Sequence, residues 1–177
     1  MSQKVKRIWN IATTVIVAVI AVFVLFLAGV RLFGLQGYTV LSGSMEPVYK
    51  TGSVIYVKQT DTAELQKDDV ITFYATGSTV ATHRIIEVVE EDGVRRFRTK
   101  GDANDIADGS LVDTQDIIGT PVFSVPYLGY ALTYIQSPPG MYVALAVGAG
   151  LLLLVFLPSL IFDEGKNKPT NQKEENQ

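Results

Sequence analysis

Two long apolar runs lie near the ends of the chain, at residues 8–30 and 141–162. Neither contains a charged residue, and each reaches the roughly 20 residues that a helix needs to cross a bilayer. A cleaved secretory signal usually has an apolar core of only about 7–15 residues, followed by a small-residue cleavage site. The first run is longer, and no clear A-x-A site follows it. We therefore expect an uncleaved signal-anchor helix over residues 8–33 and a second transmembrane helix over residues 141–162.

Basic residues flank both runs on the sides that face the chain ends. They are Lys4, Lys6 and Arg7 before the first run, and Lys166, Lys168 and Lys173 after the second. The positive-inside rule then predicts that both termini are cytoplasmic and that residues 34–140 are extracytoplasmic. We expect residues 1–7 to be a cytoplasmic N-terminus and the polar residues 163–177 to be a disordered cytoplasmic tail. A buried core helix is the other interpretation of the second run.

The stretch between the two runs has the pattern of a β domain. Segments rich in β-branched and aromatic residues occur at residues 53–58, 69–75, 80–89, 94–100 and 117–125. Asp92-Gly93 separates the third segment from the fourth and predicts a hairpin turn. Gly119 and Pro121 in the last segment indicate a bulge or an edge strand. No long amphipathic helix is expected here, so the fold class is mainly β.

Composition narrows the chemistry that this domain could perform. The net charge is −3, which gives no reason to expect a nucleic-acid partner. The chain has no cysteine, which excludes disulfides, thiolate catalysis and cysteine-bound metal. It has one histidine, His83, so a multi-histidine metal site within the chain is excluded too.

One short motif, LSGSMEP at residues 41–47, follows the first apolar run and carries two serines around a glycine. A serine hydroxyl becomes a good nucleophile only when a base removes its proton. The G-x-S-x-G and S-x-x-K arrangements are both absent. His83, in the strand-like stretch VATHRII, is the remaining candidate base, since the pKa of a free histidine lies near 6.5.

A second motif, TKGDANDIADG at residues 99–109, holds three aspartates: Asp102, Asp105 and Asp108. A carboxylate can hold a histidine in one tautomer and stabilise its charged form. Spacing alone does not choose among the three. The spacing of an EF-hand calcium loop and its terminal glutamate are missing, so no metal is expected. Each feature alone is typical of an ordinary loop or strand; their occurrence together in one small domain favours catalysis.

Taken in order, these segments resemble type I signal peptidases. The similarity lies in LSGSMEP, GSVIYV, DDVITF, THRIIEV, TKGDANDIAD and GTPVFSVPYLGY. It covers the first helix and essentially the whole domain between the apolar runs. A histidine in THRI, where the bacterial branch carries a lysine, resembles the endoplasmic-reticulum and archaeal branch, which also occurs in some Gram-positive bacteria. The implied fold is a signal-peptidase-like all-β catalytic domain flanked by two transmembrane helices.

The resemblance also implies roles for individual residues. Ser44 would be the nucleophile, His83 the general base and Asp108 the third catalytic member. Asp102 is included among the catalytic candidates, although its place in the motif resembles a structural one. The Ser42 hydroxyl and the Ser44 backbone N–H would stabilise the oxyanion. Relatives often carry two asparagines after KGD, whereas this chain has Ala103 there.

The implied function is that of a membrane-bound serine endopeptidase. It would remove signal peptides from secreted preproteins by cutting after small residues at −1 and −3, without a cofactor. Met45 and Pro47 are expected to bind substrate. The expected partners are signal peptides, the lipid bilayer and the secretion translocon, but no nucleic acid. The expected location is the plasma membrane, multi-pass, with the catalytic domain outside.

Two rival functions remain at this point. A self-cleaving repressor-type protease shares the β fold, but it is soluble and uses a lysine base. A catalytically silent membrane-anchored β domain could act as a scaffold for an extracellular assembly. A sortase-like transpeptidase is excluded because the chain has no cysteine.

Overall fold

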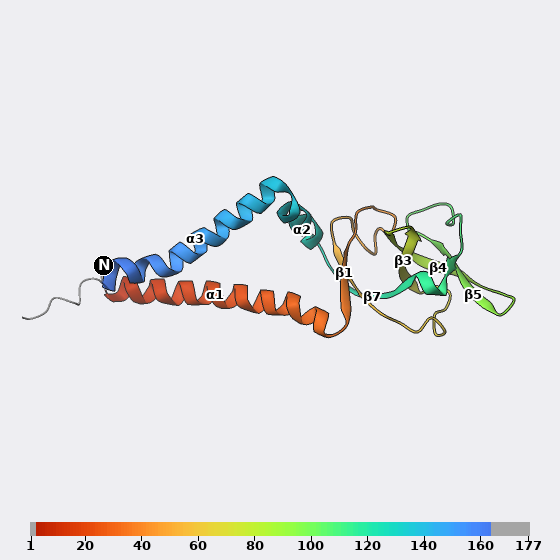
Figure 1. Cartoon of the computed structure of the whole chain (residues 1–177), viewed down its shortest axis with the longest axis horizontal. Coiled ribbons are helices and arrows are strands. Elements are labelled where there is room, and N and C mark those ends of the chain that lie inside the picture. The colour runs from red at the N-terminus through yellow and green to blue at the C-terminus, as the bar shows by residue number, and fades with distance from the viewer. Residues whose placement is uncertain (1–2, 164–177) are drawn as a thin grey trace, which may run out of the picture. The chain divides into compact units, whose positions relative to one another are not determined.

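The computed structural model describes residues 3–163 (Figure 1). The predicted tail lies outside the described residues, apart from Asp163, as do the first two residues. In chain order, the elements are α1 (Gln3–Leu32), β1 (Leu35–Thr39), β2 (Val54–Lys58), β3 (Val70–Thr76), β4 (Thr79–Glu91), β5 (Val94–Lys100), β6 (Val112–Asp113), the 3-10 helix η1 (Thr114–Asp116), β7 (Ile117–Val125), α2 (Leu128–Gln136) and α3 (Pro138–Asp163).

The chain divides into two compact units, which are described separately. One contains the described residues up to Val22 and those from Ile135 onward, and the other contains Phe23–Tyr134. Helices α1 and α3 have 30 and 26 residues. Lys4–Leu32 and Pro138–Phe156 are long and apolar enough to cross a membrane. At 1.5 Å per residue, even the shorter segment would extend about 29 Å, close to the roughly 30 Å of a bilayer's hydrocarbon core.

The second unit is built on a seven-stranded sheet with the order β1-β2-β7-β3-β4-β5-β6. Every pair of neighbouring strands is antiparallel. The mainly β fold expected from the sequence is therefore confirmed, together with the two apolar helices.

The hairpin predicted at Asp92-Gly93 joins β4 to β5. Glu91 pairs with Val94, which leaves the two turn residues between them. Their φ angles are 52° and 75°, the positive values that a type I′ turn needs at both central positions. Asp and Gly tolerate that conformation better than other residues, so this pair of residues specifies the register of the longest strand pair.

Gly119 and Pro121 indicated either a bulge or an edge strand, and strand β7 shows the first of these alternatives. The strand lies inside the sheet between β2 and β3, and its register shifts near Gly119 and Pro121. Gly119 has a φ of 153°, and a Cβ there would lie only 2.0 Å from the carbonyl oxygen of Lys58. Glycine is required because the backbone of β2 comes so close at the bend.

Four short elements were not expected from the sequence. They are β1, β6 with only two residues, the 3-10 helix η1 and the nine-residue helix α2. β1 reads LQGYT and carries no alternating pattern of its own, yet it pairs with β2 over its whole length. It forms the edge of the sheet on that side.

Two apolar clusters hold this unit together. The first consists of Leu65, Ile71, Phe73, Ile85, Phe97 and Val112 and lies under β3, β4 and β5. The second consists of Val30, Val54 and Tyr56, with partly buried side chains from β7 and α2 packed against it. The first cluster lies close to His83, because the Phe73 and His83 rings meet in an edge-to-face arrangement with their centroids 6.2 Å apart.

Candidate active site

Ser44 lies in the loop between β1 and β2, and this loop is tied at several points. Its base is closed by Val40 N–H to Ser53 O and by Gly52 N–H to Val40 O. Within the loop, Glu46 N–H donates a hydrogen bond to Gly43 O and closes a turn. Met45 is only 2% exposed and anchors the loop in the interior. Ser44 is thus presented from an ordered loop, with an apolar neighbour buried beside it.

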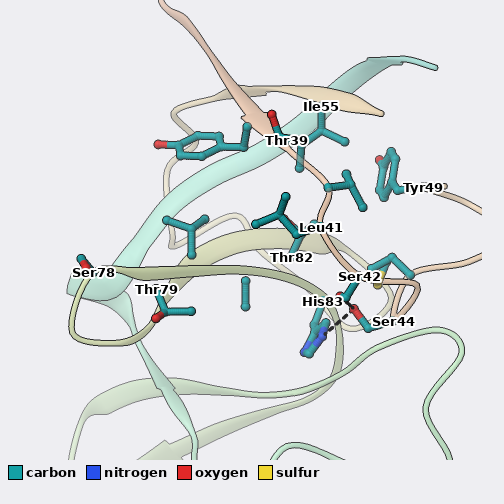
Figure 2. A pocket seen from close by; sticks show the side chains of 15 residues that line it. Thr39, Leu41, Ser42, Ser44, Tyr49, Ile55, Ser78, Thr79, Thr82 and His83 are labelled. Carbon is teal, nitrogen blue, oxygen red and sulfur yellow. Dashed lines mark hydrogen bonds between the residues drawn. The ribbon is translucent and has the colours of Figure 1, made fainter. Parts of the chain in front are cut away.

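His83 brings the candidate serine and one aspartate together. Its Nε2 lies 3.3 Å from Ser44 Oγ, the contact marked by a dashed line in Figure 2, and its Nδ1 lies 2.6 Å from Asp108 Oδ2. The His83 and Asp108 side chains are 14% and 24% exposed. The three residues come from the β1–β2 loop, from β4 and from the loop after β5. A carboxylate at Nδ1 favours the tautomer in which Nε2 is free to accept the serine proton.

Asp102 faces a different partner. Arg84 donates from Nε to Asp102 Oδ1 at 2.8 Å and from a terminal nitrogen to Oδ2 at 2.7 Å, a bidentate pair. The hydrogen bonds from Arg84 lower the pKa of the Asp102 carboxyl. Because Arg84 follows His83 in β4, its side chain leaves the strand on the opposite face. The pair therefore fastens the KGD loop to β4 from the side away from His83.

Among the three aspartates, Asp108 is the one that contacts the histidine, and Asp102 binds the arginine. Asp105, the third, is exposed. In the described part of the chain, no group of His, Cys, Asp and Glu side chains is arranged to hold a metal ion.

The KGD loop also contacts the backbone of Ser44. Ala103 N–H donates to the Ser44 carbonyl oxygen at 2.9 Å. A Cβ at Gly101 would lie 2.6 Å from that same oxygen, closer than real Cβ atoms come. Gly101 is therefore required by the close approach of two backbones. The loop that carries Asp108 is in this way bonded directly to the residue that carries the candidate nucleophile.

Ser42, the candidate oxyanion donor, lies beside Ser44. The two hydroxyl oxygens are 3.3 Å apart, and the Ser42 side chain is exposed (Figure 2). A hydroxyl next to the attacking oxygen can turn its O–H toward the substrate carbonyl.

A pocket of about 590 Å³ opens next to Ser44 and His83. Two chain segments form its walls (Figure 2). One is residues 38–42, which run from the end of β1 into the loop after it, and the other is residues 78–83, at the start of β4. Met45, Tyr49 and Ile55 complete the lining. Of the two predicted substrate-binding residues, Met45 lines the pocket, whereas Pro47 is exposed and is not among its lining residues.

Both walls of the pocket offer backbone that the sheet does not use. β1 pairs only with β2, and β5 pairs with β4 from Arg84 onward. In the described ladders, residues 79–83 are therefore paired on the β3 side alone. An extended peptide placed between the walls could hydrogen-bond to either of them as an added strand.

Comparison with known proteins points to one family. The family described as signal peptidase, peptidase S26 matches residues 10–92, a stretch that includes Ser44 and His83. Signal peptidase I W of Bacillus subtilis is 43% identical over 120 residues, which cover 63% of this chain and 63% of the relative. A catalytic subunit of the signal peptidase complex from Homo sapiens is 30% identical over 125 residues, 65% of each chain. The chain thus matches about two thirds of the length of these relatives, slightly less in both cases.

Proposed function

We propose that the chain belongs to the signal peptidase family, in the branch with the endoplasmic-reticulum and archaeal enzymes, and that it is a membrane-anchored serine endopeptidase that removes signal peptides from secreted preproteins. The observation that carries the proposal is the continuous chain of contacts from Ser44 through His83 to Asp108. No observation within the described residues favours the scaffold alternative.

In the proposed reaction, Ser44 Oγ attacks the carbonyl carbon at the cleavage site. His83 Nε2 accepts the serine proton, while Asp108 stabilises the charge that forms on the imidazole. The Ser44 N–H and the Ser42 hydroxyl stabilise the oxyanion. His83 then gives the proton to the departing amine, and a water molecule, activated by the same base, releases the acyl group from Ser44.

The pocket next to Ser44 supports an extended substrate. Backbone hydrogen bonds along its two walls would give affinity, and small side chains at −1 and −3 would fit into the remaining space. Thr39, Leu41 and Thr82 are among the residues that line the pocket (Figure 2). We propose that Met45 forms the floor of the subsite nearest the cleaved bond, because it lines the pocket and is buried.

The expected membrane topology also supports this function. We propose that α1 and α3 both cross the plasma membrane, with the termini in the cytoplasm and the β unit outside, as the basic flanks predict. A preprotein whose signal peptide spans the same membrane would then present its cleavage site on the side of Ser44. The lipid bilayer and the secretion translocon are the proposed partners in this arrangement.

The test is the cleavage of a secretory preprotein by the full chain in liposomes. Wild type is compared with Ser44→Ala, His83→Ala and His83→Lys, and the cut site is identified by mass spectrometry. We expect wild type to cut after a small residue and both alanine variants to be inactive. Full activity in His83→Ala would contradict the assignment of the base. No cleavage by wild type, beside an active control peptidase, would contradict the function.

A further inference from the structure

Thr99, the last residue but one of β5, is a fully buried polar side chain beside the candidate site. It is 0% exposed, although its neighbours in the strand, Arg98 and Lys100, are basic. A buried hydroxyl needs a hydrogen-bond partner, and Thr99 donates to Asp108 Oδ2 at 2.6 Å. Its carbonyl oxygen accepts from the Asp108 N–H at 2.9 Å. Thr99 therefore holds the same residue by its main chain and by its side chain.

The oxygen that Thr99 holds is also the one that faces the histidine. Asp108 Oδ2 lies 2.6 Å from His83 Nδ1 as well as 2.6 Å from Thr99 Oγ1. The two donors come from neighbouring strands: Thr99 pairs with Ile85, and Ile85 lies two residues after His83, on the same face of β4. The pairing of β4 with β5 thus places both donors on one side of the sheet, where they converge on a single carboxylate oxygen.

The Asp108 side chain needs a second hydrogen bond to hold its orientation, because the loop that carries it does little to fix that orientation. It lies in a loop, its side chain is 24% exposed, and Gly109 and Ser110 after it are exposed as well. A carboxylate on a loop can rotate about its side-chain bonds, and each rotation would move Oδ2 away from Nδ1. A second donor anchored in a strand makes one rotamer the preferred one.

We propose that Thr99 is a positioning residue of the catalytic centre, whose hydroxyl keeps Asp108 Oδ2 directed at His83 Nδ1. The proposal deepens the proposed function and rests on it, since Asp108 matters for turnover only if Ser44 and His83 perform the reaction. Thr99 acts through Asp108 and has no contact with substrate in this scheme. A side chain with only a structural role would instead affect folding and leave turnover by the folded protein unchanged.

The kinetic test uses the full chain in detergent and two substitutions at one position. Thr99→Val keeps the branched shape and removes the donor, and Thr99→Ser keeps the donor. The matched control is Thr120→Val, since Thr120 also bonds another hydroxyl, that of Thr60, but lies outside the site. We expect Thr99→Val to lower kcat about 10-fold with KM changed by less than about 2-fold. Thr99→Ser and Thr120→Val are expected to stay within about 3-fold of wild type.

A double-mutant cycle separates an action through Asp108 from any other effect. In an Asp108→Asn background, which already lacks the oriented carboxylate, Thr99→Val is expected to cause little further loss. A full additional 10-fold loss in that background would overturn the proposal, and so would a Thr99→Ser variant as poor as Thr99→Val.

A spectroscopic readout does not depend on finding the right substrate. His83 is the one histidine of the chain, so histidine labelled with ¹⁵N gives the signals of that ring alone. We expect the Nδ1 proton signal to move in Thr99→Val and to stay in Thr99→Ser and Thr120→Val. An unchanged signal in folded Thr99→Val would overturn the proposal. If wild type cleaves no preprotein, the proposed function fails, and this signal still decides whether Thr99 controls the Asp108–His83 contact.

Discussion

Gly101→Ala should damage catalysis more than folding, because the added Cβ would collide with the backbone of Ser44. That Cβ would lie 2.6 Å from the Ser44 carbonyl oxygen and 2.8 Å from the Asn104 side-chain nitrogen, whereas real Cβ atoms essentially never come within 3.0 Å. The Ser44 oxygen belongs to backbone, so relief requires the loop and the Ser44 segment to move apart by a few tenths of an ångström. The hydrogen bond from Ala103 N–H to Ser44 O, now 2.9 Å, would lengthen with them.

The size of the effect follows from the position of Ser44. A misplacement of about 1 Å can cost about 100-fold in rate, so a shift of several tenths should lower kcat roughly 10-fold or more. Overpacking of this kind costs about 1 to 3 kcal/mol of stability, which corresponds to a fall in Tm of roughly 4 to 20 °C for a domain of this size. KM should change little, because the walls of the pocket are not touched.

The assay is steady-state cleavage of a fluorogenic peptide with small residues at −1 and −3, together with thermal unfolding. The matched control is Gly109→Ala in the same loop, where a Cβ would have nothing within 4 Å. Wild-type kcat in folded Gly101→Ala would refute the reasoning, since the loop would then not position Ser44. An equal loss in Gly109→Ala would refute it too, because the effect would not come from the collision.

Three further predictions follow from the contacts of the same site. Asp102→Asn should lower the free energy of unfolding by roughly 1 to 2 kcal/mol at neutral pH. Because Arg84 lowers the pKa of Asp102, this contribution is fully present above the ordinary carboxyl pKa near 4, and it should disappear as the pH falls through the lowered value. The test is chemical unfolding of wild type and Asp102→Asn between pH 7 and pH 2. A difference in the free energy of unfolding that stayed constant over this range would show that the ion pair is not the source of the stabilisation. Asp108→Asn should lower kcat by about 1,000-fold or more, whereas Asp105→Asn, at an exposed position, should stay within about 2-fold. Equal losses in the two variants would contradict the distinction between these aspartates. Ser42→Ala should lower kcat by about 100-fold or more with KM nearly unchanged, as removal of an oxyanion donor does; wild-type turnover in the purified variant would contradict that role.

The parts of the fold that could be predicted are those with a local signal. The central strands carry runs of β-branched and aromatic side chains, and the turn at Asp92-Gly93 needs positive φ at both positions. β1 has neither kind of signal: LQGYT becomes a strand because β2 pairs along it, and that pairing is not local. The position of β7 inside the sheet was left open by the sequence for a similar reason, since Gly119 and Pro121 are as typical of an edge as of an internal bulge.

The candidate site shows the same division. Ser44 could be found from the sequence because it lies in the LSGSMEP motif that carries the family resemblance, and His83 because it is the one histidine of the chain. The choice among the aspartates depends on how the loop after β5 folds back, which the hydrogen bond from Asp108 N–H to Thr99 O decides. Thr99 itself gave no signal, since a threonine in a strand is an ordinary β-former.

The position of β7 has a consequence for the stage of synthesis at which the candidate site forms. Ser44 adjoins the β1–β2 half of the sheet, and His83 and Asp108 belong to the half from β3 to β6. Among the described strands, β7 is the one that pairs with both halves, through β2 and β3. Contacts between residues so distant in sequence form late in folding, because a long loop must close first. Until residues 117–125 have left the ribosome, β7 cannot join the two halves of the sheet, so we expect Ser44 to meet His83 and Asp108 only after this strand is added.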